Sequence, residues 1–144
     1  MFKRIVVPTD GSEITAKAVR TAVELARLSG AELLAIAVKE PFPYSAISEM
    51  QPVPPQEFYD AQERVAFAHA KAVADAAKAV GVSCQAHTVE ALHPWEAIVD
   101  HAKEKQADLI VMASHGRRGV SALLLGSETQ KVLTHASLPV LVVR

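Results

Sequence analysis

The chain has 144 residues, of which half are apolar and 22% are charged, and its formal net charge is −1. This composition is typical of one soluble globular domain, whose length suffices to bury about 70% of the unfolded surface. The small net charge excludes a global attraction to nucleic acid or anionic lipid. A single cysteine, Cys84, excludes an internal disulfide, a Cys-rich zinc site and a CxxC redox pair.

Neither the opening of the sequence nor its interior predicts a targeting or membrane segment. The residues MFKRIVVPTD contain a short apolar run before Pro8, whereas a signal peptide needs a longer one. No apolar run approaches the roughly 20 residues needed to span a bilayer. We therefore expect one cytoplasmic domain over residues 1–144.

Short, β-branched apolar runs alternate along the chain with segments whose apolar residues recur at helical spacing. The first run, Ile5–Val7, predicts a strand buried on both faces. Ala16, Val19 and Val23 then follow at three- and four-residue steps, and Gly30 ends that helix. The predicted strands are 5–7, 33–38, 82–89, 107–113 and 138–143, and the predicted helices are about 12–29, 57–80, 94–105 and 127–135.

Local signals refine the ends of these elements. Asp10 and Ser12 are both good helix N-caps, and Asp10 with Glu13, like Ser127 with Gln130, has the spacing of a capping box. Pro94 suits the first turn of a helix that carries Trp95 as a packing aromatic. Residues 39–56 contain five of the eight prolines, so we expect a long, mobile surface loop there.

The alternation of strands and helices predicts an α/β fold with a parallel sheet covered on both faces. For five strands, the common doubly wound arrangement has one reversal of strand order. Such a sheet binds ligands outside the carboxyl ends of its strands, at the point where the order reverses.

Two predicted strands end in loops whose residues suit a phosphorylated nucleotide. The first ends in Pro8-Thr9-Asp10-Gly11-Ser12, and the fourth ends in Ala113-Ser114-His115-Gly116-Arg117-Arg118-Gly119. Glycine N–H groups can cradle phosphate oxygens, and a helix that begins at Gly126–Ser127 adds partial positive charge. Asp10 can accept from a ribose hydroxyl or hold Mg²⁺. The loop matches neither Walker A nor GxGxxG, so the glycines could equally supply turns and a helix cap.

The whole chain resembles the universal stress protein family. The resemblance rests on the opening Ile-Val-Val-Pro-Thr-Asp-Gly-Ser, the Ser-His-Gly-Arg-Arg-Gly loop, Leu-Leu-Leu-Gly-Ser and the terminal Pro-Val-Leu-Val-Val-Arg. It implies a five-stranded sheet of order 3-2-1-4-5 and a homodimer that pairs through the last strand, 138–143.

ATP-binding members of that family carry Gly, two residues, Gly, nine residues, then Gly-Ser or Gly-Thr. Here Gly116 and Gly126–Ser127 fill the later positions, whereas Ala113 replaces the first glycine. The resemblance implies ATP with Mg²⁺ as ligands, with Asp10 as the metal-binding residue. It places Pro8, Thr9, Asp10 and Val38 around the adenosine, Met112 and Ala113 near the ribose, and His115, Gly116, Arg117, Gly119, Gly126, Ser127 and Glu128 around the phosphates.

Two other functions stay open at this point. The protein could be a slow ATPase or a nucleotidyl- or phosphoryl-transferring enzyme, with His115, Asp10 and Glu128 as the candidate bases or nucleophiles. It could instead be a dimeric interaction protein whose nucleotide site is lost, because Ala113 resists positive φ and adds a methyl group. The six histidines show no HExxH motif or tight ligand cluster, so we expect no zinc site. A Ser-His-Asp triad, a nucleic-acid partner and a membrane partner are not expected either.

Overall fold

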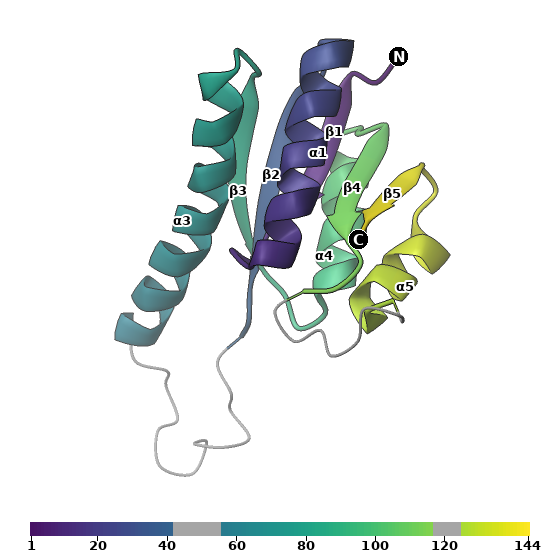
Figure 1. Cartoon of the computed structure of the whole chain (residues 1–144). Coiled ribbons are helices and arrows are strands. Elements are labelled where there is room, and N and C mark those ends of the chain that lie inside the picture. Colours follow the sequence, from purple (N-terminus) through teal and green to yellow (C-terminus); the bar gives the residue numbers. More distant parts are fainter. Residues whose placement is uncertain (42–55, 117–124) are drawn as a thin grey trace.

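A computed structural model describes residues 1–41, 56–116 and 125–144, in which strands and helices alternate (Figure 1). The strands are β1 (Arg4–Pro8), β2 (Glu32–Lys39), β3 (Cys84–Glu90), β4 (Leu109–Ala113) and β5 (Val140–Val143). The helices are α1 (Glu13–Ser29), α3 (Gln56–Ala79), α4 (Pro94–Glu104) and α5 (Ser127–His135). The α/β alternation predicted from hydrophobic periodicity is therefore confirmed, with shifts of one to two residues at most ends.

The five strands form one parallel sheet of order β3-β2-β1-β4-β5. The chain proceeds outward from β1 to β3, crosses back to β4 on the other side of β1, and continues to β5. This is the doubly wound arrangement expected from the sequence, and its reversal lies between β1 and β4. Because all strands are parallel, their carboxyl ends meet at one edge of the sheet, which we call the carboxyl edge.

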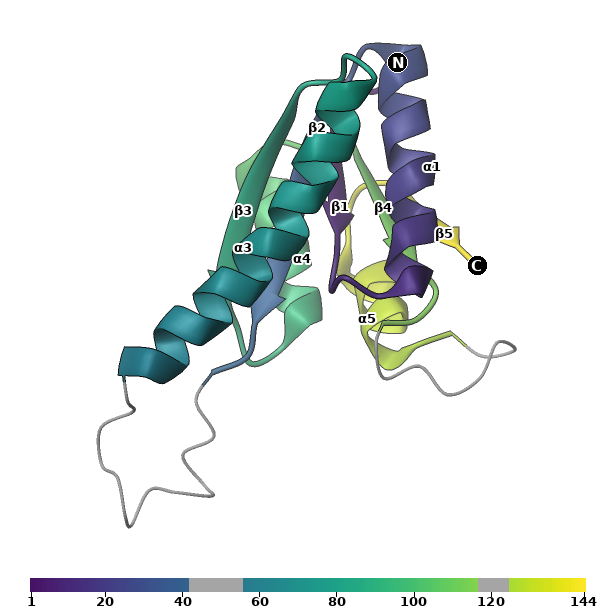
Figure 2. The same ribbon diagram turned by 60° about the vertical axis from the view of Figure 1, so that its left-hand side comes forward.

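Two helices cover each face of the sheet, as the two views show (Figure 1, Figure 2). Ile5 and Val7 of β1 belong to the core beneath α1 and α3, whereas Val6 belongs to the core beneath α4 and α5. All three side chains are fully buried, which explains why β1 is apolar at consecutive positions. The buried residues of α1 and α3 are mostly alanines, so these two helices lie close to the sheet; they are Thr15, Ala18, Ala22, Ala26, Ala66, Ala70, Val73 and Ala77.

The helix caps differ from the two predicted capping boxes. Of the two N-caps expected for α1, the structure uses Ser12 rather than Asp10, because the side chain of Ser12 accepts from the N–H of Thr15 at 3.3 Å. Gly126, not Ser127, precedes α5 as its N-cap, and Gln130 donates its amide to the carbonyl of Leu125 at 3.1 Å. The spacing rule failed at both sites because a nearby residue took the N-cap position. The expectation that Gly30 ends α1 is confirmed, since Gly30 has a φ of 74°.

The predicted proline-rich loop, 39–56, is described at its two ends. Lys39 is the last residue of β2, and Gln56 is the first residue of α3. The expected mobility concerns residues 42–55, which lie outside the described ranges. Within those ranges, no helix has the length and apolar character needed to cross a membrane.

Leu33→Ala should destabilise the protein far more than Leu28→Ala. Leu33 is fully buried in β2, whereas Leu28 is 70% exposed on α1. Truncation of a buried leucine removes apolar burial and leaves a cavity, at a cost of about 2–5 kcal/mol. The free energy of unfolding, measured by urea denaturation, should fall by that amount for Leu33→Ala and change by less than about 0.5 kcal/mol for Leu28→Ala. Similar losses for both variants would contradict the described core.

Candidate functional site

The carboxyl ends of β1 and β4 are direct neighbours, because Ile5 pairs with Leu109 and Val6 with Ile110. Within the described ranges, every buried polar side chain except His101 lies at or beside this end of the two strands. The members of this group are Thr9, Thr15, Ser114, His115 and Thr129. Buried polar groups cost free energy unless they are hydrogen-bonded. Their concentration at one edge of the sheet identifies that edge as the candidate functional site.

The Asp10 carboxylate is held by the first turn of α1. Its Oδ1 atom accepts from the N–H of Ser12 at 2.9 Å and from the hydroxyl of Thr15 at 3.0 Å. The N-terminus of a helix carries partial positive charge, which further stabilises a carboxylate at this place. Asp10 therefore has a defined orientation at the end of β1.

Gly116 brings the backbone after β4 against the same carboxylate. A Cβ atom at this position would lie 3.0 Å from Oδ2 of Asp10, a spacing that few real Cβ contacts reach. Glycine avoids crowding of the Asp10 carboxylate here, and the φ of Gly116 is not in the left-handed region. The two loops that the sequence assigned to one ligand site thus approach each other across Asp10 and Gly116.

Gly126 closes the other end of the glycine-rich segment onto β4. Its N–H donates to the carbonyl of Ser114 at 2.8 Å, and a Cβ at this position would lie 3.0 Å from that oxygen. Thr129, one turn into α5, donates its hydroxyl to the carbonyl of Ala113 at 2.9 Å. The N-terminus of α5 is therefore anchored at the carboxyl edge.

Glu128 of α5 makes a hydrogen bond to the first turn of α4. Its Oε2 atom accepts from the N–H of Trp95 at 2.8 Å, so the carboxylate caps the first turn of α4. The ring of Trp95 stacks on His135 at a centroid distance of 4.3 Å. The predicted helix start at Pro94 with a packing aromatic is confirmed.

The other predicted site residues occupy the same edge where they are described. Pro8 ends β1, Val38 is half-buried near the end of β2, and Met112 and Ala113 are buried at the end of β4. The N–H of Thr9 donates to the carbonyl of Ile36, which ties β1 to β2 at this level. The remaining predictions, Arg117 and Gly119, fall outside the described residues.

Ser114 and His115, neighbours in the sequence, are in side-chain contact just after β4. Nδ1 of His115 lies 3.2 Å from Oγ of Ser114, and both side chains are buried. The contact uses Nδ1, the imidazole nitrogen nearer the backbone. The arrangement differs from a nucleophile–base–carboxylate chain, in which Nδ1 faces the carboxylate.

His69 of α3 is a residue of this edge that the sequence did not reveal. Gly11 has a φ of 78°, and a Cβ on it would overlap the imidazole ring of His69. The ring therefore lies directly over the turn that positions Asp10. Nothing in the helical pattern of α3 distinguishes His69, because the contact joins residues far apart in the sequence.

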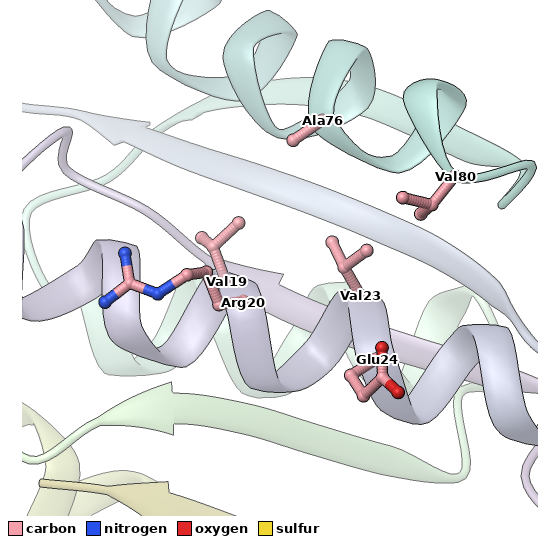
Figure 3. A pocket seen from close by; sticks show the side chains of 6 residues that line it. All are labelled: Val19, Arg20, Val23, Glu24, Ala76 and Val80. Carbon is pink, nitrogen blue, oxygen red and sulfur yellow. The ribbon is translucent and has the colours of Figure 1, made fainter.

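A hollow of about 310 Å³ lies elsewhere, between α1 and α3 (Figure 3). Val19 and Val23 of α1 face Ala76 and Val80 of α3 across it, with Arg20 and Glu24 at its side. None of the residues predicted to bind nucleotide lines this hollow.

The strand order and the polar, glycine-lined carboxyl edge define a doubly wound α/β protein, a class that binds ligands at this edge. The sequence model of the universal stress protein family matches residues 1–144. This chain therefore belongs to the universal stress protein family.

Individual relatives agree with this assignment. Universal stress protein MJ0531 of Methanocaldococcus jannaschii is 34% identical over 153 residues, an alignment that covers 100% of this chain and 83% of the relative. The solved structure of hypothetical protein MJ0577, a universal stress protein of the same organism, matches with a TM-score of 0.78 at 27% identity, covering 99% of this chain and 96% of that chain. A universal stress protein in complex with cAMP matches with a TM-score of 0.74 at 27% identity, covering 99% and 97%.

Gly11→Ala should destabilise the protein more than Gly81→Ala. Both glycines have a φ of 78°, so both variants carry the strain of a left-handed residue, about 1–2 kcal/mol. At Gly81 the new methyl group meets open space, whereas at Gly11 it displaces His69. We expect an additional loss of about 0.5–1.5 kcal/mol in the free energy of unfolding for Gly11→Ala, the cost of moving the imidazole from its rotamer.

The same measurement in a His69→Ala background isolates the contact. Removal of the imidazole should bring the cost of Gly11→Ala close to that of Gly81→Ala. If the difference between the two glycines persists without His69, the ring does not pack on this turn.

Proposed function

We propose that this universal stress protein binds an adenine nucleotide at the carboxyl edge, between the ends of β1 and β4. One observation carries the proposal: Asp10, a fixed hydrogen-bond acceptor, lies against the glycine backbone of residue 116. Acceptors suit ribose hydroxyls, and exposed backbone N–H groups suit phosphate oxygens. The related protein solved with cAMP supports an adenine nucleotide as the ligand.

The ligand that we favour is ATP, with the assignment of site residues given by the family resemblance. The adenosine is expected beside Thr9, Asp10 and Val38, and the phosphates beside Gly116 and the N-terminus of α5. The first turn of α5 supports this orientation, because its N–H groups and dipole attract anions. Ser127 is the first residue of that turn and is exposed.

Mg²⁺ accompanies ATP in this proposal, and Asp10 is the residue that would hold it. The ion prefers oxygen ligands and is usually bound through one or two carboxylates together with substrate phosphates and water. The Asp10 carboxylate fits that donor set, since one of its oxygens faces Gly116. When bound, Mg²⁺ would offset the charge that the phosphates place near the carboxylates of this edge.

The site supports retention of the nucleotide more than its rapid turnover. The three candidate catalytic groups each have a structural partner: Asp10 with Ser12 and Thr15, His115 with Ser114, and Glu128 with Trp95. A base committed to such a contact is poorly placed to activate water at a terminal phosphate. We therefore propose a cytoplasmic stress-response protein that acts through its bound state.

Calorimetric titration of nucleotide-free protein with ATP and Mg²⁺ tests the proposal. The parent chain should bind one nucleotide, and Gly116→Asp should weaken binding by at least about tenfold, or 1.4 kcal/mol, because it sets a second carboxylate beside Asp10 and the phosphates. Ser83→Asp is the matched control, since it adds the same charge just before β3, at the opposite edge of the sheet.

The same titration separates the alternatives. Parallel runs with AMP and cAMP identify the preferred number of phosphates, and phosphate release measures any hydrolysis. If the parent fails to bind any adenine nucleotide but Ala113→Gly binds, Ala113 has closed the site and the interaction-protein hypothesis holds. Equal binding by the parent and Gly116→Asp would place the ligand elsewhere.

We further propose that two copies of the chain pair through β5. This strand is the edge of the sheet beside β4, and Leu141 at its centre is 39% exposed. An uncovered apolar edge strand invites pairing with another strand. Leu141→Lys should convert a dimer into a monomer in sedimentation equilibrium, whereas Leu92→Lys, at a residue that is 72% exposed after β3, should not. A monomeric parent would contradict the proposal.

A further inference from the structure

The first turn of α4 is capped by a side chain of another helix. His93 occupies the N-cap position of α4 but makes no side-chain hydrogen bond to the helix, and Pro94 at the first helical position has no N–H to donate. The N–H of Trp95 is therefore the first donor of the helix, at a position that an N-cap side chain commonly satisfies. It donates instead to Oε2 of Glu128, in the first turn of α5, at 2.8 Å.

The ring of Trp95 contacts the last turn of the same helix, α5. The indole stacks on the imidazole of His135, with centroids 4.3 Å apart and ring planes 29° apart. Nδ1 of His135 lies 2.8 Å from the carbonyl oxygen of Lys131, which holds the imidazole against its own helix. Trp95 therefore meets α5 at both ends, through its backbone N–H at the first turn and through its ring at the last turn.

The strand β4 holds the first turn of α5 from another direction. Thr129 donates its hydroxyl to the carbonyl of Ala113, and the N–H of Gly126 donates to the carbonyl of Ser114. Glu128 precedes Thr129 in this turn and connects it to α4. The first turn of α5 is thus fixed between β4 and α4, with its N–H groups at the carboxyl edge, where the proposed function places the phosphates.

The charge of Glu128 suits a link to α4 better than a contact with the nucleotide. The family resemblance places Glu128 around the phosphates, where a carboxylate would repel them. The hydrogen bond to Trp95 instead directs Oε2 to the N-terminus of α4, whose partial positive charge stabilises a carboxylate. A carboxylate that accepts from a backbone N–H also makes a stronger hydrogen bond than a neutral acceptor does.

We infer that Glu128 is a positioning residue of the nucleotide site, which holds the first turn of α5 in the orientation that receives the phosphates. The inference rests on the proposed function, because it assigns a role within that site. Glu128 acts through α5 and touches neither the nucleotide nor Mg²⁺. Loss of its acceptor oxygen should therefore weaken the binding of phosphates, whereas loss of its charge alone should not.

Two substitutions separate the acceptor oxygen from the charge. Both remove the negative charge, but Glu128→Gln keeps an oxygen that can accept from the N–H of Trp95, whereas Glu128→Ala does not. In calorimetric titration with ATP and Mg²⁺, Glu128→Gln should bind at least as tightly as the parent. Glu128→Ala should bind about fivefold more weakly than Glu128→Gln, the effect of one hydrogen bond.

Adenosine distinguishes positioning of α5 from a general loss of structure. It has no phosphates, and its expected contacts lie at Thr9, Asp10 and Val38, away from α5. The parent and both variants should therefore bind adenosine equally, which also shows that Glu128→Ala is folded. Glu96→Ala is the matched control, because it removes an exposed carboxylate from the first turn of α4 and should leave ATP affinity unchanged.

The fluorescence of Trp95 tests the link between the helices without any nucleotide. Trp95 is the only tryptophan of the sequence and is half-buried. Its emission maximum should move to longer wavelength in Glu128→Ala, because the loosened helices admit water to the indole, and should stay at the parent value in Glu128→Gln. An unchanged emission maximum in Glu128→Ala would contradict the link.

The titrations distinguish failure of this inference from failure of the proposed function. If the parent binds ATP but the two Glu128 variants bind it alike, or if Glu128→Ala loses ATP and adenosine to the same extent, the positioning role is overturned and the nucleotide site stands. Weakening in both variants that requires Mg²⁺ would instead identify Glu128 as a metal ligand. A parent that binds no adenine nucleotide overturns the proposed function and this role together.

Discussion

The direct pairing of β1 with β4 is the constraint on which the rest of the structure depends. The chain leaves β1 toward β2 on one side and returns to β4 on the other side. The loops that follow β1 and β4 therefore lie side by side at the carboxyl edge. Asp10 and Gly116 meet for this reason. A different strand order would separate the carboxylate from the glycine backbone, and neither loop alone would form a site.

Much of the fold follows from local pattern. The consecutive apolar residues of β1 indicate a strand that is buried on both faces of the sheet. The alternation of such short apolar runs with segments of helical periodicity predicts parallel strands joined by helices. The part of the site that could be predicted also depends on local sequence, because its glycines and its carboxylate follow directly after predicted strands. The predicted capping boxes failed because two residues near a helix start compete for one N-cap, and spacing alone does not rank Ser12 against Asp10.

The contacts that sequence reasoning missed all join residues of different helices, strands or turns. His69 reaches Gly11 from α3, Glu128 reaches α4 from α5, and His87 meets His101 across a strand and a helix. The spacing of apolar residues in the sequence does not indicate which of these polar side chains meet. Such contacts depend on helix rotation and tilt over the sheet, which a single sequence specifies only through the packing of the whole core.

The alanine-rich faces with which α1 and α3 pack on the sheet limit the substitutions that this protein can accept during evolution. Small residues leave no room for an added methyl group, so a larger side chain at Ala70 or Ala22 must move a helix outward from the sheet. Displacement of α3 would carry His69 away from the turn that orients Asp10. Sequence drift on this face is therefore coupled to the geometry of the carboxyl edge, while exposed positions such as Leu28 can vary without that consequence.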